Sequence, residues 1–154
     1  MIAHKPRPAS VDTLISIGEE RDALGASLLD ARQAWELIRA AEVDDFAYRP
    51  HRLIFQAMRG LEPPFECSSL AGELDRHGLL ELAGGVQYIT DLDMGVVPER
   101  PMSGRLLRLR ELARLRRLVR LGEGLVTQPY EPGANSLQIV RPIVAELSRW
   151  ETRR

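Results

Sequence analysis

The sequence has few residues of the kinds that bind metals or form disulfides. It contains one cysteine, Cys67, and three histidines, His4, His51 and His77. A single cysteine excludes a disulfide within the chain, and the histidines are too widely separated to supply tetrahedral ligands by local spacing. We therefore expect neither a metal ion nor any other cofactor.

Lysine is almost absent as well. The only lysine, Lys5, follows no glycine-rich segment. The phosphate-binding loop of ATPases has the pattern G-x-x-x-x-G-K-[ST], because backbone amides and the ammonium group together hold the triphosphate. The sequence therefore lacks a Walker A loop, and we expect no enzymatic activity. Gly84-Gly85 has no lysine and no preceding strand, so it is interpreted as a turn between helices.

Long apolar runs are also missing. No run approaches the about 18 consecutive apolar residues of a transmembrane helix, and the first ten residues, MIAHKPRPAS, lack the apolar region of a secretory signal. A cytoplasmic protein without membrane contact is expected. With 44% hydrophobic and 28% charged residues, the composition is typical of a folded helical protein. The length suffices for one domain, but not for an additional RecA-like ATPase domain of about 200 residues.

Apolar residues recur at helical spacing through most of the chain, and no alternating strand pattern of useful length occurs. Residues 1–13 show no periodicity and are interpreted as a flexible arm. Five short helices are predicted over residues 14–94, the first of them over about residues 17–29, and together they form a compact globular head. The predicted fold class is therefore all-α.

Capping residues indicate where these short helices begin and end. Side chains that can accept hydrogen bonds from the first amides precede three of them: Asp30 with Gln33, Asp44 with Asp45, and Ser68 or Ser69. Pro50 is expected in the first turn of the third helix, and Gly78 is expected to end the fourth. Val86, Ile89 and Leu92 then predict the apolar face of the fifth.

A long antiparallel helical hairpin is predicted over residues 101–152. Its first helix covers residues 102–127, a Pro- and Gly-rich turn follows, and Asn135 with Gln138 can cap the second helix. Pro142 falls inside that second helix, where the missing amide and the ring should kink the helix or move its start.

The apolar faces of the hairpin helices predict a self-association interface. A hairpin of only two helices leaves an apolar face uncovered, and a second copy is the simplest cover, so a dimer or higher oligomer is expected. The predicted interface residues are Leu107, Leu112, Leu115, Leu118, Val119, Leu137, Val140, Val144 and Leu147.

The first hairpin helix is also strongly basic. From Arg100 to Arg120 there are eight arginines and one acid, Glu111. Such a face can neutralise DNA phosphates, can contact acidic protein surfaces, or can be merely solvated. Leucines rather than stacking aromatic residues lie between the arginines, which favours protein contact and only weak or indirect DNA contact. The candidate contact residues are Arg105, Arg108, Arg110, Arg114, Arg116, Arg117 and Arg120.

Four other side chains have both a functional and a structural interpretation. His51 lies on an amphipathic helix, so a buried, hydrogen-bonded histidine is favoured over a contact residue. Cys67 is interpreted as a small apolar filler rather than a nucleophile. Trp35 is expected in the core, whereas core packing and an interface stay equally open for Trp150.

Several segments together resemble a known family. They are LGASLLD after Glu20, YRPHRLIF after Phe46, LLELAGGVQYITDL from Leu79, and VVPERP followed by the Arg/Leu-rich helix. In order and spacing over residues 18–130, these segments resemble the N-terminal domain of DnaB-type replicative DNA helicases.

The resemblance implies a role in DNA replication without catalysis. It implies dimers formed through the hairpin, a collar on a helicase ring, and a surface on which primase docks. The expected partners are therefore a second copy, primase and full-length helicase subunits. Family members continue into a motor domain, which this sequence does not contain. The alternative is a small Arg-rich nucleic-acid-binding or regulatory protein that uses the long helix directly.

Overall fold

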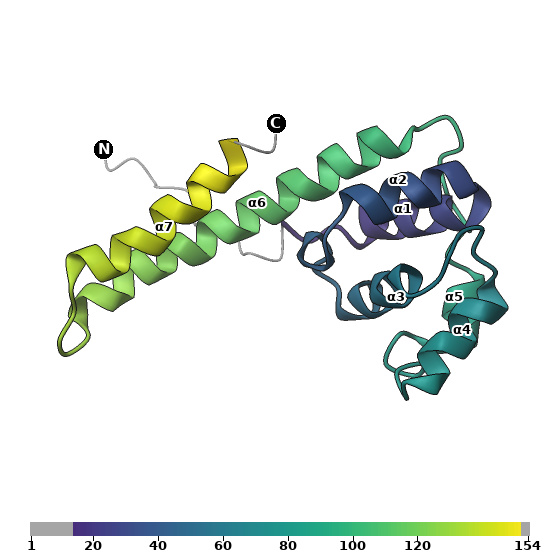
Figure 1. Cartoon of the computed structure of the whole chain (residues 1–154), viewed down its shortest axis with the longest axis horizontal. Coiled ribbons are helices and arrows are strands. Elements are labelled where there is room, and N and C mark those ends of the chain that lie inside the picture. Colours follow the sequence, from purple (N-terminus) through teal and green to yellow (C-terminus); the bar gives the residue numbers. More distant parts are fainter. Residues whose placement is uncertain (1–13, 152–154) are drawn as a thin grey trace, which may run out of the picture. The chain divides into compact units, whose positions relative to one another are not determined.

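All regular elements in residues 14–151, which the computed structural model describes, are helical (Figure 1). The predicted all-α class is therefore confirmed, while the predicted arm, residues 1–13, lies outside the described residues. The helices are α1 (Ile17–Leu29), α2 (Ala31–Ala40), α3 (Arg49–Arg59), α4 (Cys67–Arg76), α5 (Gly85–Thr90), α6 (Met102–Thr127) and α7 (Ser136–Glu151), with short 3-10 helices η2 (Val43–Asp45) and η3 (Gln128–Tyr130).

Contacts divide the chain into two compact units, with the division between Ala113 and Arg114. This division falls inside α6, so the first turns of α6 belong to the unit that contains α1 to α5. The sequence-based prediction divides the chain elsewhere, into a head of residues 14–94 and a hairpin of residues 101–152. It follows the helix pattern and so assigns all of α6 to the hairpin.

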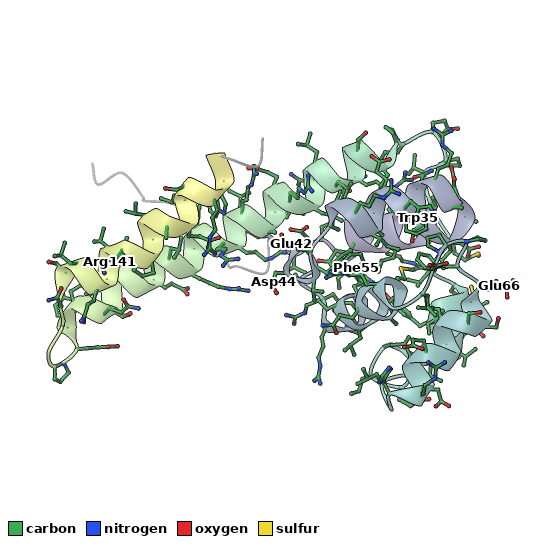
Figure 2. All side chains as sticks on the ribbon, viewed as in Figure 1. Trp35, Glu42, Asp44, Phe55, Glu66 and Arg141 are labelled. Carbon is green, nitrogen blue, oxygen red and sulfur yellow. The ribbon has the colours of Figure 1, made fainter. Side chains whose placement is uncertain are left out.

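The first unit is built around one hydrophobic core to which α1 to α6 all contribute. Phe46 and Phe55 both belong to it, with ring centroids 4.9 Å apart. Figure 2 labels Phe55 on α3. Because α6 also contributes Met102, Leu106 and Leu109 to this core, the start of that helix belongs to the same packed unit as the short helices.

Helix α1 has the predicted bounds, and the cap of α2 is half as predicted. Asp30 accepts a hydrogen bond from the Arg32 amide at 2.7 Å and so caps α2. The second half of the predicted capping box is wrong, because the Gln33 side chain accepts a hydrogen bond from Arg105 Nη1 at 3.0 Å instead. A tertiary partner has replaced the local one.

The start of α3 differs from the prediction. Asp44 and Asp45 lie in η2, where Asp45 Oδ2 accepts a hydrogen bond from the Glu42 amide at 2.8 Å, so neither residue caps α3. Helix α3 follows Tyr48 and carries Pro50 in its first turn, as predicted. The N-cap residue Tyr48 makes no capping hydrogen bond with its side chain.

The predicted cap of α4 is also wrong. Glu66 is the N-cap residue, and Ser68 and Ser69 lie inside the first turn, because the helix already begins at Cys67. The predicted end is correct, since Gly78 adopts φ +66° just after the helix and the Leu79 amide donates to the Leu74 carbonyl at 2.8 Å.

Helix α5 begins at the predicted glycine turn. Gly84 has φ +104°, and a Cβ atom there would lie 2.7 Å from Tyr88 Cγ, so both backbone and packing require glycine. Ile89 and Leu92 are buried as predicted. Val86 is 57% exposed, contrary to the prediction, because only Ile89 and Leu92 of this short segment reach the core.

The second unit contains the end of α6, η3 and α7. Helix α7 runs back along the end of α6 in the opposite direction (Figure 1). Asn135 Oδ1 accepts hydrogen bonds from the Leu137 and Gln138 amides at 3.0 and 3.2 Å, which confirms the Asn135 half of the predicted capping box. Helix α7 begins directly after this cap and continues past Pro142, so the proline has not moved its start.

Candidate interaction surface

Helix α7 has two apolar faces, and one of them is uncovered. The buried and half-buried positions are Ile139, Ile143, Glu146 and Trp150. The uncovered face consists of Leu137, Val140, Val144 and Leu147, which are 70%, 44%, 55% and 38% exposed. We call these four residues the α7 stripe; their spacing places them on one side of the helix.

A buried carboxylate fixes which face of α7 turns inward. Glu146 is 9% exposed, and its Oε1 forms an ion pair with Arg117 Nε of α6 at 2.8 Å. Trp150 Nε1 donates to the same oxygen at 3.2 Å, and Arg149 Nη1 lies 3.5 Å from Oε2. This cluster ties α7 to α6 through the Glu146 face and leaves the α7 stripe turned to solvent.

The predicted interface residues on α6 have very different surroundings. Leu107 and Leu118 are 74% and 44% exposed, and Leu115 and Val119 are half-buried. Leu112 departs from the prediction, because it is only 4% exposed and is therefore already covered within the chain. The α7 members of the predicted interface are thus brought together on one exposed face, whereas the α6 members are not.

The predicted basic surface is smaller than the sequence indicates. Arg108, Arg117 and Arg120 are exposed, and Arg110 and Arg114 are half-buried. Arg110 Nη2 donates to the Ala40 carbonyl. The other two predicted members, Arg105 and Arg116, are buried, with 0% and 4% exposure, so they do not belong to an exposed surface.

Arg105 is buried because all five of its N–H donors have acceptors. Nε and Nη2 donate to the two carboxylate oxygens of Asp22 at 2.8 and 3.1 Å, and Nη2 also donates to the Val97 carbonyl at 2.6 Å. Nη1 donates to Gln33 Oε1 at 3.0 Å and to the Arg100 carbonyl. A guanidinium group with a full set of partners tolerates burial.

A second buried network joins α1, α3 and α5. Glu20 is 1% exposed and accepts hydrogen bonds from the Ala47 and Tyr48 amides at 2.7 and 3.2 Å and from His51 Nδ1 at 2.9 Å. His51 Nε2 lies 2.8 Å from the Tyr88 hydroxyl. Burial, with smaller contributions from Tyr48 and Glu20, raises the pKa of Tyr88. The predicted buried, hydrogen-bonded His51 is confirmed.

Sequence reasoning missed Glu20, Asp22 and Gln33 as partners in these networks. The available signal was the group of acids at positions 19, 20 and 22 on a helix that is otherwise mostly apolar or small. The two networks fix the fold of the first unit.

Two other predicted side chains have contrasting outcomes. Burial, and secondarily the nearby Asp93 carboxylate, raises the pKa of the half-buried Cys67 thiol, which agrees with a filler rather than a nucleophile. The prediction that Trp35 lies in the core is wrong, because its side chain is 39% exposed, with the Arg39 guanidinium 5.2 Å from the ring centroid.

Within residues 14–151, no helix is long and apolar enough to cross a membrane.

Comparisons with known proteins agree with this architecture. The family model for the DnaB-like helicase N terminal domain matches residues 13–103. The replicative DNA helicase DnaB of Mycobacterium leprae is 32% identical over 138 residues, which are 85% of this chain and 22% of the helicase. That of Buchnera aphidicola from Schizaphis graminum is 37% identical over 81 residues, which are 50% of this chain and 17% of the helicase.

A solved structure also matches most of the chain. The N-terminal domain of the DnaB helicase from Mycobacterium tuberculosis superposes with a TM-score of 0.76 at 28% identity, covering 88% of this chain and 97% of that domain. The chain spans about a fifth of the length of the curated helicases, 17% and 22% in the two cases above. Sequence and structure together show that the chain belongs to the family of DnaB-like helicase N-terminal domains.

Proposed function

We propose that this chain is a non-catalytic interaction module of a replicative DNA helicase, which self-associates through the hairpin, contributes to a collar and offers a docking surface to primase. The observation that carries the proposal is the exposed α7 stripe. Four aliphatic side chains on one side of a helix are costly to leave in water, and burying them against another protein surface is favourable. Membership of the helicase N-terminal family supports the same role.

The arginines support protein contact rather than DNA binding. Arg105 and Arg116 are buried, and the exposed Arg117 forms an ion pair with Glu146. Fewer of the predicted basic residues are therefore exposed to bind phosphates than the sequence alone suggests. Affinity for DNA depends on the number of phosphates that are neutralised, and a short row of cations gives weak, salt-sensitive binding.

Self-association is tested by replacing the centre of the α7 stripe. Static light scattering of the unmodified chain should give the mass of two or more copies, and the double variant Val140→Glu/Val144→Glu should give a folded monomer, because carboxylates cannot be buried there without partners. Gln138→Glu, an exposed substitution on another side of α7, is the control and should keep the oligomer. A folded double variant of unchanged mass would show that the interface lies elsewhere.

The α6 part of the predicted interface needs its own variant. Leu115→Glu/Val119→Glu places the same two charges on the half-buried α6 positions. If α7 supplies the interface, this variant should lose stability but keep the mass of the oligomer. Loss of the oligomer with stability retained would assign the interface to α6.

Docking is tested with calorimetry against the helicase-interaction region of primase from the same host and, separately, against single-stranded DNA. Micromolar binding of the primase region, about 8 kcal/mol, is expected, with weak DNA binding at low salt that disappears at moderate salt. Strong, steeply salt-dependent DNA binding without a protein partner would overturn the proposal in favour of a nucleic-acid-binding protein.

A further inference from the structure

Helix α3 carries a second basic surface, which lies in the first unit and not on the basic helix α6. Arg49, Gln56 and Arg59 are exposed, and Arg52 is half-buried. Their spacings of three, four and three residues place all four on one side of the helix, away from the residues that α3 contributes to the core. We call these four residues the α3 row. It carries three positive charges, and α3 contains no acidic residue.

The stability of α3 does not explain the position of Arg49. Arg49 is the first residue of α3, where a cation faces the positive end of the helix dipole and is unfavourable. Within residues 14–151, the guanidinium groups of Arg49, Arg52 and Arg59 make no hydrogen bond or ion pair. A merely solvated face usually carries charges of both signs, as the exposed side of α2 does with Glu36. The three cations of the α3 row therefore indicate a surface for an anionic partner.

An exposed aromatic ring lies beyond the end of the α3 row. Arg59 and Arg39 line the same cavity, of about 480 Å³, to which the last turns of α2 and α3 both contribute. Arg39 lies 5.2 Å from the ring centroid of Trp35, which is 39% exposed and is labelled on α2 in Figure 2. Glu42 and Asp44 also line the cavity, so phosphates are expected on the α3 row rather than inside the cavity.

Arginines near an exposed aromatic ring form the combination that binds single-stranded nucleic acids. Guanidinium groups bind the backbone phosphates, and the face of an unpaired base stacks on the ring. A duplex has the phosphates but no free base face, and an acidic peptide has no base to stack. On these grounds we propose that single-stranded DNA binds with its backbone along the α3 row and stacks a base on Trp35.

This contact is additional to the proposed self-association and primase docking. Only the choice of DNA rather than RNA rests on the proposed role in a DNA helicase. With three arginines in the α3 row, about three phosphates are neutralised, so the logarithm of the binding constant should fall with the logarithm of the salt concentration with a slope of about −2. The α3 row is thus the surface that makes the weak, salt-sensitive DNA contact.

Fluorescence anisotropy of a labelled oligothymidylate, titrated with the full chain at several low salt concentrations, tests the surface. Arg49→Gln/Arg59→Gln should weaken binding by about tenfold and make the salt slope shallower by about 1.4, because two phosphates lose their cations. The control Arg108→Gln/Arg120→Gln removes the same charge from exposed positions of α6 and should change the affinity by less than about twofold. Trp35→Ala should weaken binding at least about fivefold with an unchanged salt slope, because stacking releases no counterions.

A gain of binding tests the same surface without removing a native cation. Gln56→Arg adds a fourth cation to the middle of the α3 row, so binding should strengthen several-fold and the salt slope should steepen by about 0.7. The matched control is Gln138→Arg at an exposed position of α7, which should leave the affinity unchanged within about twofold. Circular dichroism checks that each variant is folded.

Each alternative has its own signature in these measurements. Equal loss of affinity in the two double variants, or a greater loss in the α6 variant, would overturn the assignment to the α3 row. Duplex DNA that binds as tightly as oligothymidylate would overturn single-strand recognition, and tighter binding of oligouridylate would overturn the choice of DNA. Binding of polyglutamate without binding of oligothymidylate would assign the row to an acidic protein. Arg49→Gln/Arg59→Gln should keep the mass of the unmodified chain in light scattering, so a failure here is distinct from a failure of self-association.

Discussion

Asp22 on α1 and Arg105 on α6 form a two-point ion pair between residues 83 positions apart, with N–O distances of 2.8 and 3.1 Å. The pair also holds the loop before α6, because the Val97 amide donates to Asp22 Oδ1 at 3.0 Å and the Val97 carbonyl accepts from Arg105. One buried charge pair thus fixes the loop and the start of α6 on the same helix of the first unit.

Replacing Arg105 should be strongly destabilising. Arg105→Met leaves the largely buried Asp22 carboxylate with only the longer Arg100 contact at 3.4 Å and the Val97 amide, and the free energy of unfolding should fall by about 3 kcal/mol. Urea denaturation measures this change. Arg108→Met, on an exposed position of the same helix, is the matched control and should change stability by less than about 0.5 kcal/mol. Equal effects of the two substitutions would contradict the importance of the pair.

Removing the Glu20 carboxylate should also destabilise the first unit. Glu20→Ala leaves the Ala47 and Tyr48 amides and His51 Nδ1 without their acceptor, at a cost of about 2 to 4 kcal/mol. Chemical denaturation, monitored by circular dichroism, measures this loss in the free energy of unfolding. Glu36→Ala, at an exposed position of α2, should be nearly neutral. A stable Glu20→Ala variant would show that water can replace the carboxylate.

The raised pKa of Cys67 should make its thiol slow to react. A raised pKa means that a smaller fraction is thiolate at a given pH, so alkylation by iodoacetamide should be several-fold slower than for free cysteine near neutral pH. The rate should rise with pH through a midpoint above that of free cysteine. Asp93→Asn removes one cause and should lower the midpoint, whereas Asp75→Asn should leave it unchanged. Reaction as fast as free cysteine would contradict this.

The hairpin should loosen when Glu146 is replaced. Glu146→Ala removes the acceptor shared by Arg117, Arg149 and Trp150, so amide hydrogen exchange in α7 should increase by about tenfold, while α1 to α4 keep their protection. The control is Glu123→Ala on an exposed position of α6, which should have no such effect. Increased exchange throughout the chain would instead indicate global destabilisation.

The parts of the fold that the sequence predicts well are those with local causes. The bounds of α1 and α6 are as predicted, because long periodic segments with clear ends depend mainly on neighbouring residues. The acceptor of the amides just before α3 and the role of Gln33 are missed, because Glu20 and Arg105 reach these positions from distant parts of the chain. No local pattern records such partners.

The candidate surface shows the same limit. A helical wheel groups Leu112 with Leu115 and Leu118, but it does not say which neighbour covers each face, and the structure covers Leu112 while exposing much of Leu118. Arg105 is the clearest case, because an arginine among arginines is expected in solvent. Only the arrangement of Asp22, Gln33 and the loop carbonyls makes its burial favourable.

The Glu20 carboxylate has a consequence for how the first unit folds. It accepts hydrogen bonds from the Ala47 and Tyr48 amides, directly before α3, from 27 and 28 residues away, and α3 has no side-chain cap of its own. A peptide of residues 43–60 should therefore have little helix in water, and α3 should become persistent only when α1 docks. Helix growth and tertiary docking are then one kinetic event, so this helical protein should refold more slowly than its many local contacts suggest.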